Sequence, residues 1–244
     1  MSDATFSVDL EALLEAGCHF GHQARRWNPK MAQYIYGERD GVHIFDLAKT
    51  AQGLEAASQK IAEAAKQGRS VVFIGTKRQS QDIVREEVVN AGAMYITNRW
   101  PGGLITNWEQ VGKSIKRLNS LKKDKAEGKF NVYTKKENVL IDREIARLER
   151  FFGGVSTLTG IPDILVITDV NKDIVAVKEA HMRGVFIIAI CDSNVNPDLV
   201  DLVIPANDDA IGSLKIIIAT LAKAFKEGKA MNQSAKEKQP VETK

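Results

Sequence analysis

The chain has 244 residues, of which 44% are apolar, so it can form one sheet-based domain with an insertion or two small domains. Its 34 basic and 31 acidic residues leave a net charge of +3, which alone does not indicate a nucleic-acid partner. Two cysteines exclude a disulfide framework, and the longest apolar run, residues 185–191, is far below the roughly 18 residues of a membrane span. We expect a cytoplasmic protein with no membrane partner.

Three elements are predicted in the first part of the chain. A short helix is expected over residues 10–16, where apolar residues recur before a glycine. Residues 34–36 and 42–45 flank a glycine-bounded turn and predict a small hairpin. A long amphipathic helix follows over residues 46–67.

After this helix, apolar runs alternate with helical segments. The predicted strands are residues 71–74, 94–97, 164–167, 186–190 and 202–204. The predicted helices that alternate with them are residues 79–90, 172–183 and 209–226. Runs without a polar face indicate strands buried on both sides, as in parallel sheets. The alternation therefore predicts an α/β fold with a doubly wound, mostly parallel five-stranded sheet.

One segment, residues 107–152, interrupts this alternation. Two capping-box patterns, beginning at Thr106 and Thr134, predict the starts of two helices. Apolar residues along both helices recur at spacings of three and four, which predicts a coiled-coil-like antiparallel helical hairpin. The sheet domain is thus expected to comprise residues 1–106 and 153–228. Residues 229–244 lack an apolar period and are expected to form a disordered tail.

The basic residues are unevenly distributed and concentrate in this insertion. Residues 107–152 contain twelve lysines and arginines against seven acids. Lys113, Lys116 and Arg117 lie at neighbouring positions of the first helix, where like charges repel one another. A phosphate backbone would relieve that repulsion and release counterions. The alternative is an ordinary solvated helix surface.

Residues 17–30 combine cationic, aromatic and amide side chains in a segment kept out of regular helix by glycines and a proline. Cations bind phosphates, rings stack on unpaired bases, and amides form hydrogen bonds to base edges. The segment therefore predicts RNA contacts, and the alternative is a polar loop with a half-buried tryptophan. The candidate residues are His22, Gln23, Arg25, Arg26, Trp27 and Lys30.

Residues 98–108 form a second loop with similar chemistry. It leaves a predicted strand at its carboxyl end, where open parallel sheets place ligands. Arg99 and Trp100 precede a Pro-Gly-Gly turn and are candidates for RNA contact. Trp100 could equally cover the sheet as part of the core.

An enzymatic site is poorly supported. Residues 75–78 follow a strand and open a helix but lack the spacing of a nucleotide-binding loop, so Lys77 and Arg78 suit an RNA phosphate equally well. Asp169 and Asp192 end two strands, where a metal or phospho-acceptor pocket could form. Such aspartates more often cap the next turn or helix.

Cys18, His19 and His22 are three potential zinc ligands close together in the sequence. A second pair of ligands at the spacing of a zinc finger does not follow. We therefore expect neither a metal nor another cofactor.

The ordered series of short motifs resembles the bacterial small-subunit (30S) ribosomal protein two family. The resemblance runs from about residue 10 to residue 226. The matching motifs are Gly21-His22-Gln23, Trp27-Asn28-Pro29-Lys30-Met31, Phe73-Ile74-Gly75-Thr76-Lys77, Arg99-Trp100, Gly102-Gly103, Thr106-Asn107-Trp108, Pro162-Asp163, Ile204-Pro205 and Asn207-Asp208-Asp209-Ala210.

This resemblance implies a flavodoxin-like sheet domain with an inserted helical hairpin and no catalytic activity. It implies a structural protein of the ribosome that binds small-subunit rRNA at the neck between head and body, on the solvent side. It also implies that the protein helps to anchor the large mRNA-binding protein one. We expect the chain to act as a single copy among other small-subunit proteins, not as a homo-oligomer.

Overall fold

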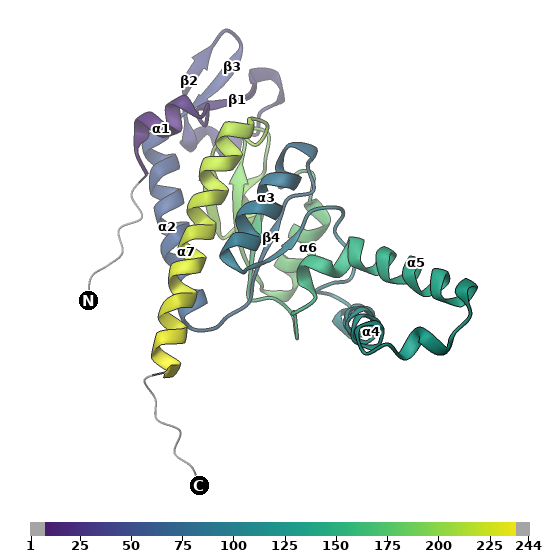
Figure 1. The fold of residues 1–244 in the computed structure, drawn as a ribbon. Helices are drawn as coiled ribbons and strands as arrows, with labels where there is room; N and C mark the ends of the chain where they lie inside the picture. Colours follow the sequence, from purple (N-terminus) through teal and green to yellow (C-terminus); the bar gives the residue numbers. More distant parts are fainter. Residues whose placement is uncertain (1–7, 238–244) are drawn as a thin grey trace.

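The computed structural model describes residues 8–237, and its centre is a five-stranded sheet (Figure 1). The strands are β4 (Val71–Ile74), β5 (Met94–Ile96), β6 (Ile164–Ile167), β7 (Phe186–Cys191) and β8 (Leu202–Pro205). All neighbours pair in parallel, in the order β5-β4-β6-β7-β8. This is the strand order of flavodoxin-like folds, so the predicted fold class is confirmed.

Helices cover both faces of this sheet, which explains why its strands are apolar throughout. One face packs against α2 (Leu47–Lys66), α3 (Arg78–Ala91) and α7 (Ile211–Glu237). The other face packs against α6 (Ile174–Arg183) and the start of α4 (Trp108–Ala126). Alternate residues of β4 point to opposite faces of the sheet. Phe73 packs in the core on the first face, and Val72 packs in the core on the other face.

A smaller antiparallel sheet lies at one end of the main sheet (Figure 1). It comprises β1 (Phe20–Gln23), β2 (Ile35–Arg39) and β3 (Val42–Phe45), in the order β1-β3-β2. The helix α1 (Leu10–Glu15) precedes it, and the 3-10 helices η1 (Ala24–Arg26) and η2 (Pro29–Tyr34) lie between β1 and β2. The predicted hairpin corresponds to β2 and β3, whereas β1 was not predicted because its polar sequence lacks a strand pattern.

The insertion between β5 and β6 contains α4, the 3-10 helix η3 (Lys129–Val132) and α5 (Lys135–Phe152), followed by η4 (Gly153–Val155). We call residues 108–152 the helical arm. In Figure 1 α4 is seen nearly end-on, whereas α5 lies lengthwise and projects from the sheet domain. The helices therefore cross steeply, and the expected coiled-coil-like antiparallel seam is not confirmed. Their shared core is small, with Leu118, Leu121 and Leu148 buried.

The two predicted capping boxes have different outcomes. Thr134 and Glu137 form a reciprocal capping box at the start of α5. The box predicted at Thr106 is wrong, because α4 begins at Trp108 with no side-chain cap from Asn107. The hydroxyl of Thr106 instead donates a hydrogen bond to Glu179, 3.1 Å away.

The prediction of a disordered tail from residue 229 is wrong as far as residue 237, because α7 continues to Glu237. Polar side chains hold this last stretch. Lys229 Nζ donates to the carbonyl of Gly92 (2.8 Å), and Asn232 donates to the carbonyl of Lys66 (2.6 Å). Both carbonyls lie at helix ends, where backbone acceptors lack helical partners. Residues 238–244 lie outside the described part of the chain.

Candidate nucleic-acid interface

Backbone pairing and capping shape the segment at residues 17–30. β1 pairs with β3, and the amide of Ala24 donates to the carbonyl of Gly41 at the end of that pairing. The side chain of Asn28 caps η2, in which Pro29 occupies the first turn. The amide of Asn28 also donates to the carbonyl of Ser193, 2.7 Å away in the loop after β7. The segment is therefore fixed to the carboxyl edge of the main sheet.

The cations of this segment are exposed. Arg25 and Arg26 have no ion pair among residues 8–237, and Arg25 Nε donates to the side chain of Gln23 at 3.0 Å. Lys30 is exposed too, but it is paired with Asp198. Arg25 and Arg26 line a hollow together with His22 and Gln23. Two guanidinium groups without an ion pair among residues 8–237, at the rim of a polar hollow, suit a phosphate or a base edge.

Trp27 is 38% exposed, and its ring centroid lies 5.0 Å from that of His43. One side of the indole therefore rests on the small sheet and the rest is open to solvent. This fits either a stacking platform for a base or the half-buried tryptophan of the alternative reading.

The loop containing Arg99 and Trp100 is organised by a buried carboxylate. Trp100 is only 6% exposed, and its Nε1 donates to Glu179 Oε1 (3.1 Å). Glu179 also accepts hydrogen bonds from the backbone amides of Gly103, Ile105 and Thr106. Burial opposes the charge on Glu179, yet these hydrogen bonds hold its pKa below the usual value.

The RNA contact predicted for Trp100 stays a prediction, and in this structure the indole takes the alternative position over the sheet. Its indole packs in the second core against the sheet and leaves no free face. Arg99, next to it, is exposed and has no ion pair among residues 8–237.

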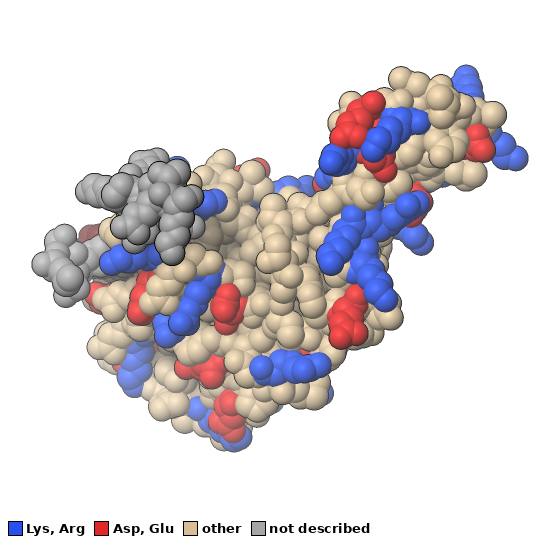
Figure 2. All heavy atoms as spheres, turned by 90° about the horizontal axis from the view of Figure 1, so that it is seen from below, with Lys and Arg blue, Asp and Glu red and all other residues tan. Residues whose placement is uncertain are grey.

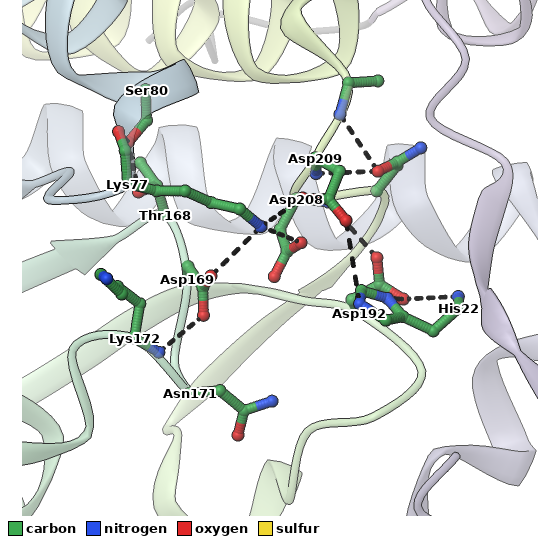
Figure 3. A network of polar contacts seen from close by, with 12 residues as sticks. His22, Lys77, Ser80, Thr168, Asp169, Asn171, Lys172, Asp192, Asp208 and Asp209 are labelled. Carbon is green, nitrogen blue, oxygen red and sulfur yellow. Dashed lines mark hydrogen bonds and ion pairs between the residues drawn. The ribbon is translucent and has the colours of Figure 1, made fainter. Parts of the chain in front are cut away.

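Lys77 lies in a polar network at the carboxyl ends of the strands (Figure 3). Its Nζ is 2.8 Å from Asp208 Oδ1, 2.7 Å from Asp209 Oδ1 and 3.2 Å from Asp169 Oδ2. The Lys77 side chain is 17% exposed. The predicted phosphate contact of Lys77 therefore stays a prediction, and in this structure its ammonium is surrounded by carboxylates. Arg78, the next residue, is exposed.

Charges in this network shift one another's pKa values. Burial lowers the pKa of Lys77, but hydrogen bonds to Asp208 and Asp209 outweigh it and raise that pKa above its usual value. Burial, together with repulsion from Asp169 and Asp192, raises the pKa of Asp208 to about 7. The crevice where flavodoxin-like folds bind ligands is thus filled by the protein's own charged side chains.

Asp169 and Asp192 act mainly as structural acceptors. Asp169 Oδ1 accepts from the amide of Lys172 at 2.8 Å, which is the turn-capping role considered from the sequence. Asp192 Oδ1 accepts from the amides of His22 (3.0 Å) and Ser193 (2.6 Å). Before α7, the capping oxygen belongs to Asn207, which accepts from the amides of Asp209 and Ala210.

The helical arm carries the second group of exposed cations. Lys113 and Lys116 of α4 are exposed and have no ion pair among residues 8–237. Arg117 is also exposed but lies 3.3 Å from Glu144 of α5. Figure 2 shows Lys and Arg side chains on the projecting arm and at its base, with fewer acidic groups between them. The acids of α5 neutralise only part of this surface.

These observations can be compared with known proteins. A family model described as ribosomal protein S2 matches residues 13–228, nearly the whole described chain. This chain belongs to the ribosomal protein S2 family. The small ribosomal subunit protein uS2 of Roseiflexus sp. (strain RS-1) is 47% identical over 227 residues, which cover 93% of this chain and 87% of that protein.

Membership of the ribosomal protein S2 family confirms the resemblance and makes the chain a structural ribosomal protein, not an enzyme. A structural role also agrees with the crevice at the carboxyl ends of the strands, because this crevice is filled by the protein's own side chains. Among residues 8–237, no helix is long and apolar enough to cross a membrane.

The zinc ligands considered from the sequence do not converge in this ribosomal protein S2 family member. Cys18 is fully buried, and its pKa is raised by that burial. His19 packs on Phe20, with ring centroids 4.0 Å apart. Neither shares a possible metal site with His22 among the described residues. Cys18 and His19 lie in the turn before β1, whereas His22 lies within the strand.

Sequence reasoning missed Glu179, which organises the loop at residues 99–106. A signal was available, since Glu179 stands between Ala176 and Ala180 on the buried face of α6. A carboxylate on an apolar helix face requires several donors. The backbone amides of a glycine-rich loop supply them, but the sequence alone does not place that loop against α6.

Proposed function

We propose that the chain binds small-subunit rRNA at the neck between head and body, on the solvent side of the subunit. The observation that supports this most directly is the presence of exposed, unpaired cations on two separate elements, residues 17–30 and the helical arm. Figure 1 shows these elements at different ends of the molecule. Contacts at both would join two RNA segments through one rigid sheet domain.

In this proposal the exposed cations contact phosphates, Trp27 stacks on a base, and His22 and Gln23 form hydrogen bonds at the polar hollow. Lys77 and Trp100 are left out because both side chains are engaged inside the protein. The phosphate-contacting residues are Arg25, Arg26, Lys30, Arg78, Arg99, Lys113, Lys116 and Arg117.

Co-sedimentation tests the proposal. The full chain is mixed with small subunits that lack this protein and is centrifuged through a high-salt gradient. We expect it to travel with the subunit, and RNase treatment should release it. Free migration under conditions that retain other core proteins would refute the proposal. Retention after complete RNA digestion would favour binding to a protein partner instead.

The proposal extends to anchoring the large mRNA-binding protein one. Its support is the family resemblance together with exposed apolar side chains at the N-terminal end. Leu10 and Leu14 of α1 are 48% and 51% exposed, and Tyr36 of β2 is 82% exposed. Leu10 and Leu14 are four residues apart and share one face of α1. Such residues suit an apolar contact with a protein partner.

This part is tested with small subunits that carry Leu10→Gln and Leu14→Gln together. We expect protein one to dissociate more readily while the variant chain itself stays bound to rRNA. A matched control is Val89→Gln, since Val89 is 53% exposed on α3, away from α1. Equal retention of protein one on both variants would refute the anchoring surface.

A further inference from the structure

Another hollow lies at one edge of the main sheet, where α3, β5 and the end of the helical arm meet. β5 is the first strand in the sheet order and forms this edge. The hollow has a volume of about 460 Å³, within the range of about 300–1,000 Å³ that small-molecule pockets occupy. We call it the edge hollow. Its lining includes Arg85, Tyr95, Asn98, Arg150 and Phe151.

Two cations in this lining have no acidic partner. Arg85 of α3 and Arg150 of α5 are exposed, and neither forms an ion pair among residues 8–237. The acidic residue of the lining, Glu149, is already paired with Lys122 of α4. Guanidinium groups bind phosphate oxygens through two parallel hydrogen bonds, so two of them around one hollow favour an anionic ligand. Neither arginine belongs to the RNA surfaces proposed above.

Aromatic side chains also line the edge hollow. Phe151 is 36% exposed, whereas its neighbour Phe152 packs partly buried against the second core. The planes of the two rings are tilted by 53° and their centroids lie 6.4 Å apart. Tyr95 of β5 is half-buried and lines the same hollow. An exposed phenylalanine contributes little to the core, but its ring can stack on a nucleic-acid base.

The edge hollow is fixed by two contacts between its walls. Asn98 Nδ2 donates to the carbonyl of Arg150 at 2.6 Å, which ties the loop after β5 to the end of α5. Gly154 lies against β5, where an added Cβ would be 2.2 Å from the carbonyl oxygen of Tyr95. Asn98 Oδ1 has no hydrogen bond among residues 8–237 and can accept one from a base. A ligand therefore meets a preformed site.

We propose that the edge hollow binds a single unpaired nucleotide. The base stacks on Phe151, Arg85 and Arg150 hold the phosphate, and Asn98 Oδ1 accepts a hydrogen bond from the base edge. A phosphate alone would not use the ring, and an apolar segment would leave both guanidinium groups without a partner. The nucleotide comes either from a looped-out stretch of rRNA, which rests on the proposed function, or from a free nucleoside monophosphate.

NMR titration of the isotope-labelled full chain with adenosine or uridine monophosphate tests the free-nucleotide source. We expect saturable shifts of the amide signals at residues 95–98 and 150–154. Inorganic phosphate and the nucleoside alone should each bind at least tenfold more weakly, because each lacks half of the contacts. The spectra also show whether the chain is folded.

Three substitutions test the roles of the lining residues. Phe151→Leu removes the ring, and Arg85→Gln and Arg150→Gln each remove one guanidinium group. Each should weaken nucleotide binding about tenfold. The matched controls replace an exposed aromatic residue and an exposed arginine that do not line the edge hollow. They are Tyr36→Leu and Arg69→Gln.

A photoreactive side chain tests the rRNA source. Phe151 is replaced by p-benzoylphenylalanine, and the full chain is assembled into small subunits that lack it. After irradiation, primer extension maps the cross-links on the rRNA. We expect one main cross-link, to a nucleotide outside base-paired helices. The same replacement at Tyr36 should not produce it.

Nucleotide binding that the three substitutions weaken supports the free source, and the expected cross-link supports the rRNA source. The proposal is overturned if the folded chain binds neither monophosphate and the cross-link reaches a paired helix, a protein neighbour or nothing. Nucleotide binding that is unchanged in all three variants would also overturn it, since the ligand would lie elsewhere. Co-sedimentation is scored separately. A chain that travels with the subunit but leaves the edge hollow empty would refute this inference and not the proposed function.

Discussion

The salt dependence of rRNA binding is the sharpest test of where the chain contacts RNA. We consider a variant in which four exposed cations become glutamine, two from the N-terminal segment and two from the helical arm. All four have no ion pair among the described residues, so their charge is free to bind phosphate. The substitutions are Arg25→Gln, Arg26→Gln, Lys113→Gln and Lys116→Gln.

The expected magnitude follows from counterion release. Each neutralised phosphate contributes about −0.9 to the slope of log K against log salt for a duplex, and about −0.7 for a single strand. Loss of four contacts should make the slope less steep by about 3. Because the four side chains are exposed, the free energy of unfolding should change little, by about 0.5 kcal/mol or less each.

Fluorescence anisotropy with a labelled small-subunit rRNA fragment, measured at a series of KCl concentrations, gives the slope. A matched control removes four exposed lysines from α2 and α7, which lie away from the proposed surfaces. An unchanged slope in the first variant would refute the proposed surfaces. An equal change in the control would show that only net charge matters. The control substitutions are Lys66→Gln, Lys215→Gln, Lys223→Gln and Lys226→Gln.

Three further predictions concern single residues. Trp27→Ala should weaken rRNA binding about tenfold in the same anisotropy assay, as expected for one lost stacking contact, and equal affinity would exclude stacking. Glu179→Gln should lower the free energy of unfolding by about 3 kcal/mol in urea, because the amide NH₂ would face backbone N–H donors; a loss below about 1 kcal/mol would contradict this. Asp173 is buried beside Thr76, and this burial raises the pKa of its carboxyl group from 3.8 to about 6. Asp169 disfavours the negative charge on Asp173, whereas Lys172 favours it. The wild-type chain should therefore lose about 3 kcal/mol relative to Asp173→Asn as the pH rises from about 4 to about 7, and parallel stability curves would refute this.

The main sheet was predictable because its strands are buried on both faces. The apolar runs at residues 71–74 and 164–167 correspond to β4 and β6 without any shift in boundary. The boundaries of α2 were also predicted to within one residue, since Asp46 caps its first turn. Elements whose stability comes from local capping and continuous apolar runs leave clear signals in one sequence.

The polar interior was much harder to predict. Lys77 and Asp208 are 131 residues apart in the chain, and nothing local distinguishes a lysine that binds carboxylates from one that binds phosphate. Trp100 raised the same difficulty, because its hydrogen-bond partner Glu179 lies on another helix. Such pairings depend on which strand ends become neighbours, and they follow only once the order of strands is known.

The end of α7 could not be predicted from the sequence for a different reason. Residues after 228 carry no apolar period, so composition alone suggested disorder. Lys229 and Asn232 instead bind carbonyls at the ends of neighbouring helices. The close approach is permitted by Gly228, where an added Cβ would collide with the carbonyl of Ala62. A helix end held by a glycine contact, a lysine ammonium and an asparagine amide shows no hydrophobic signal.

The carboxylate of Glu179 also determines how the proposed RNA surfaces act together. It ties the loop that leads into the helical arm to α6, so the base of the arm is braced against the sheet domain. The distance between the arm and residues 17–30 is then set by the protein before any RNA binds. Because this distance is fixed, the protein binds through both surfaces at once only when two RNA segments already lie at the matching separation. Unfolded rRNA would engage one surface at a time and be held weakly.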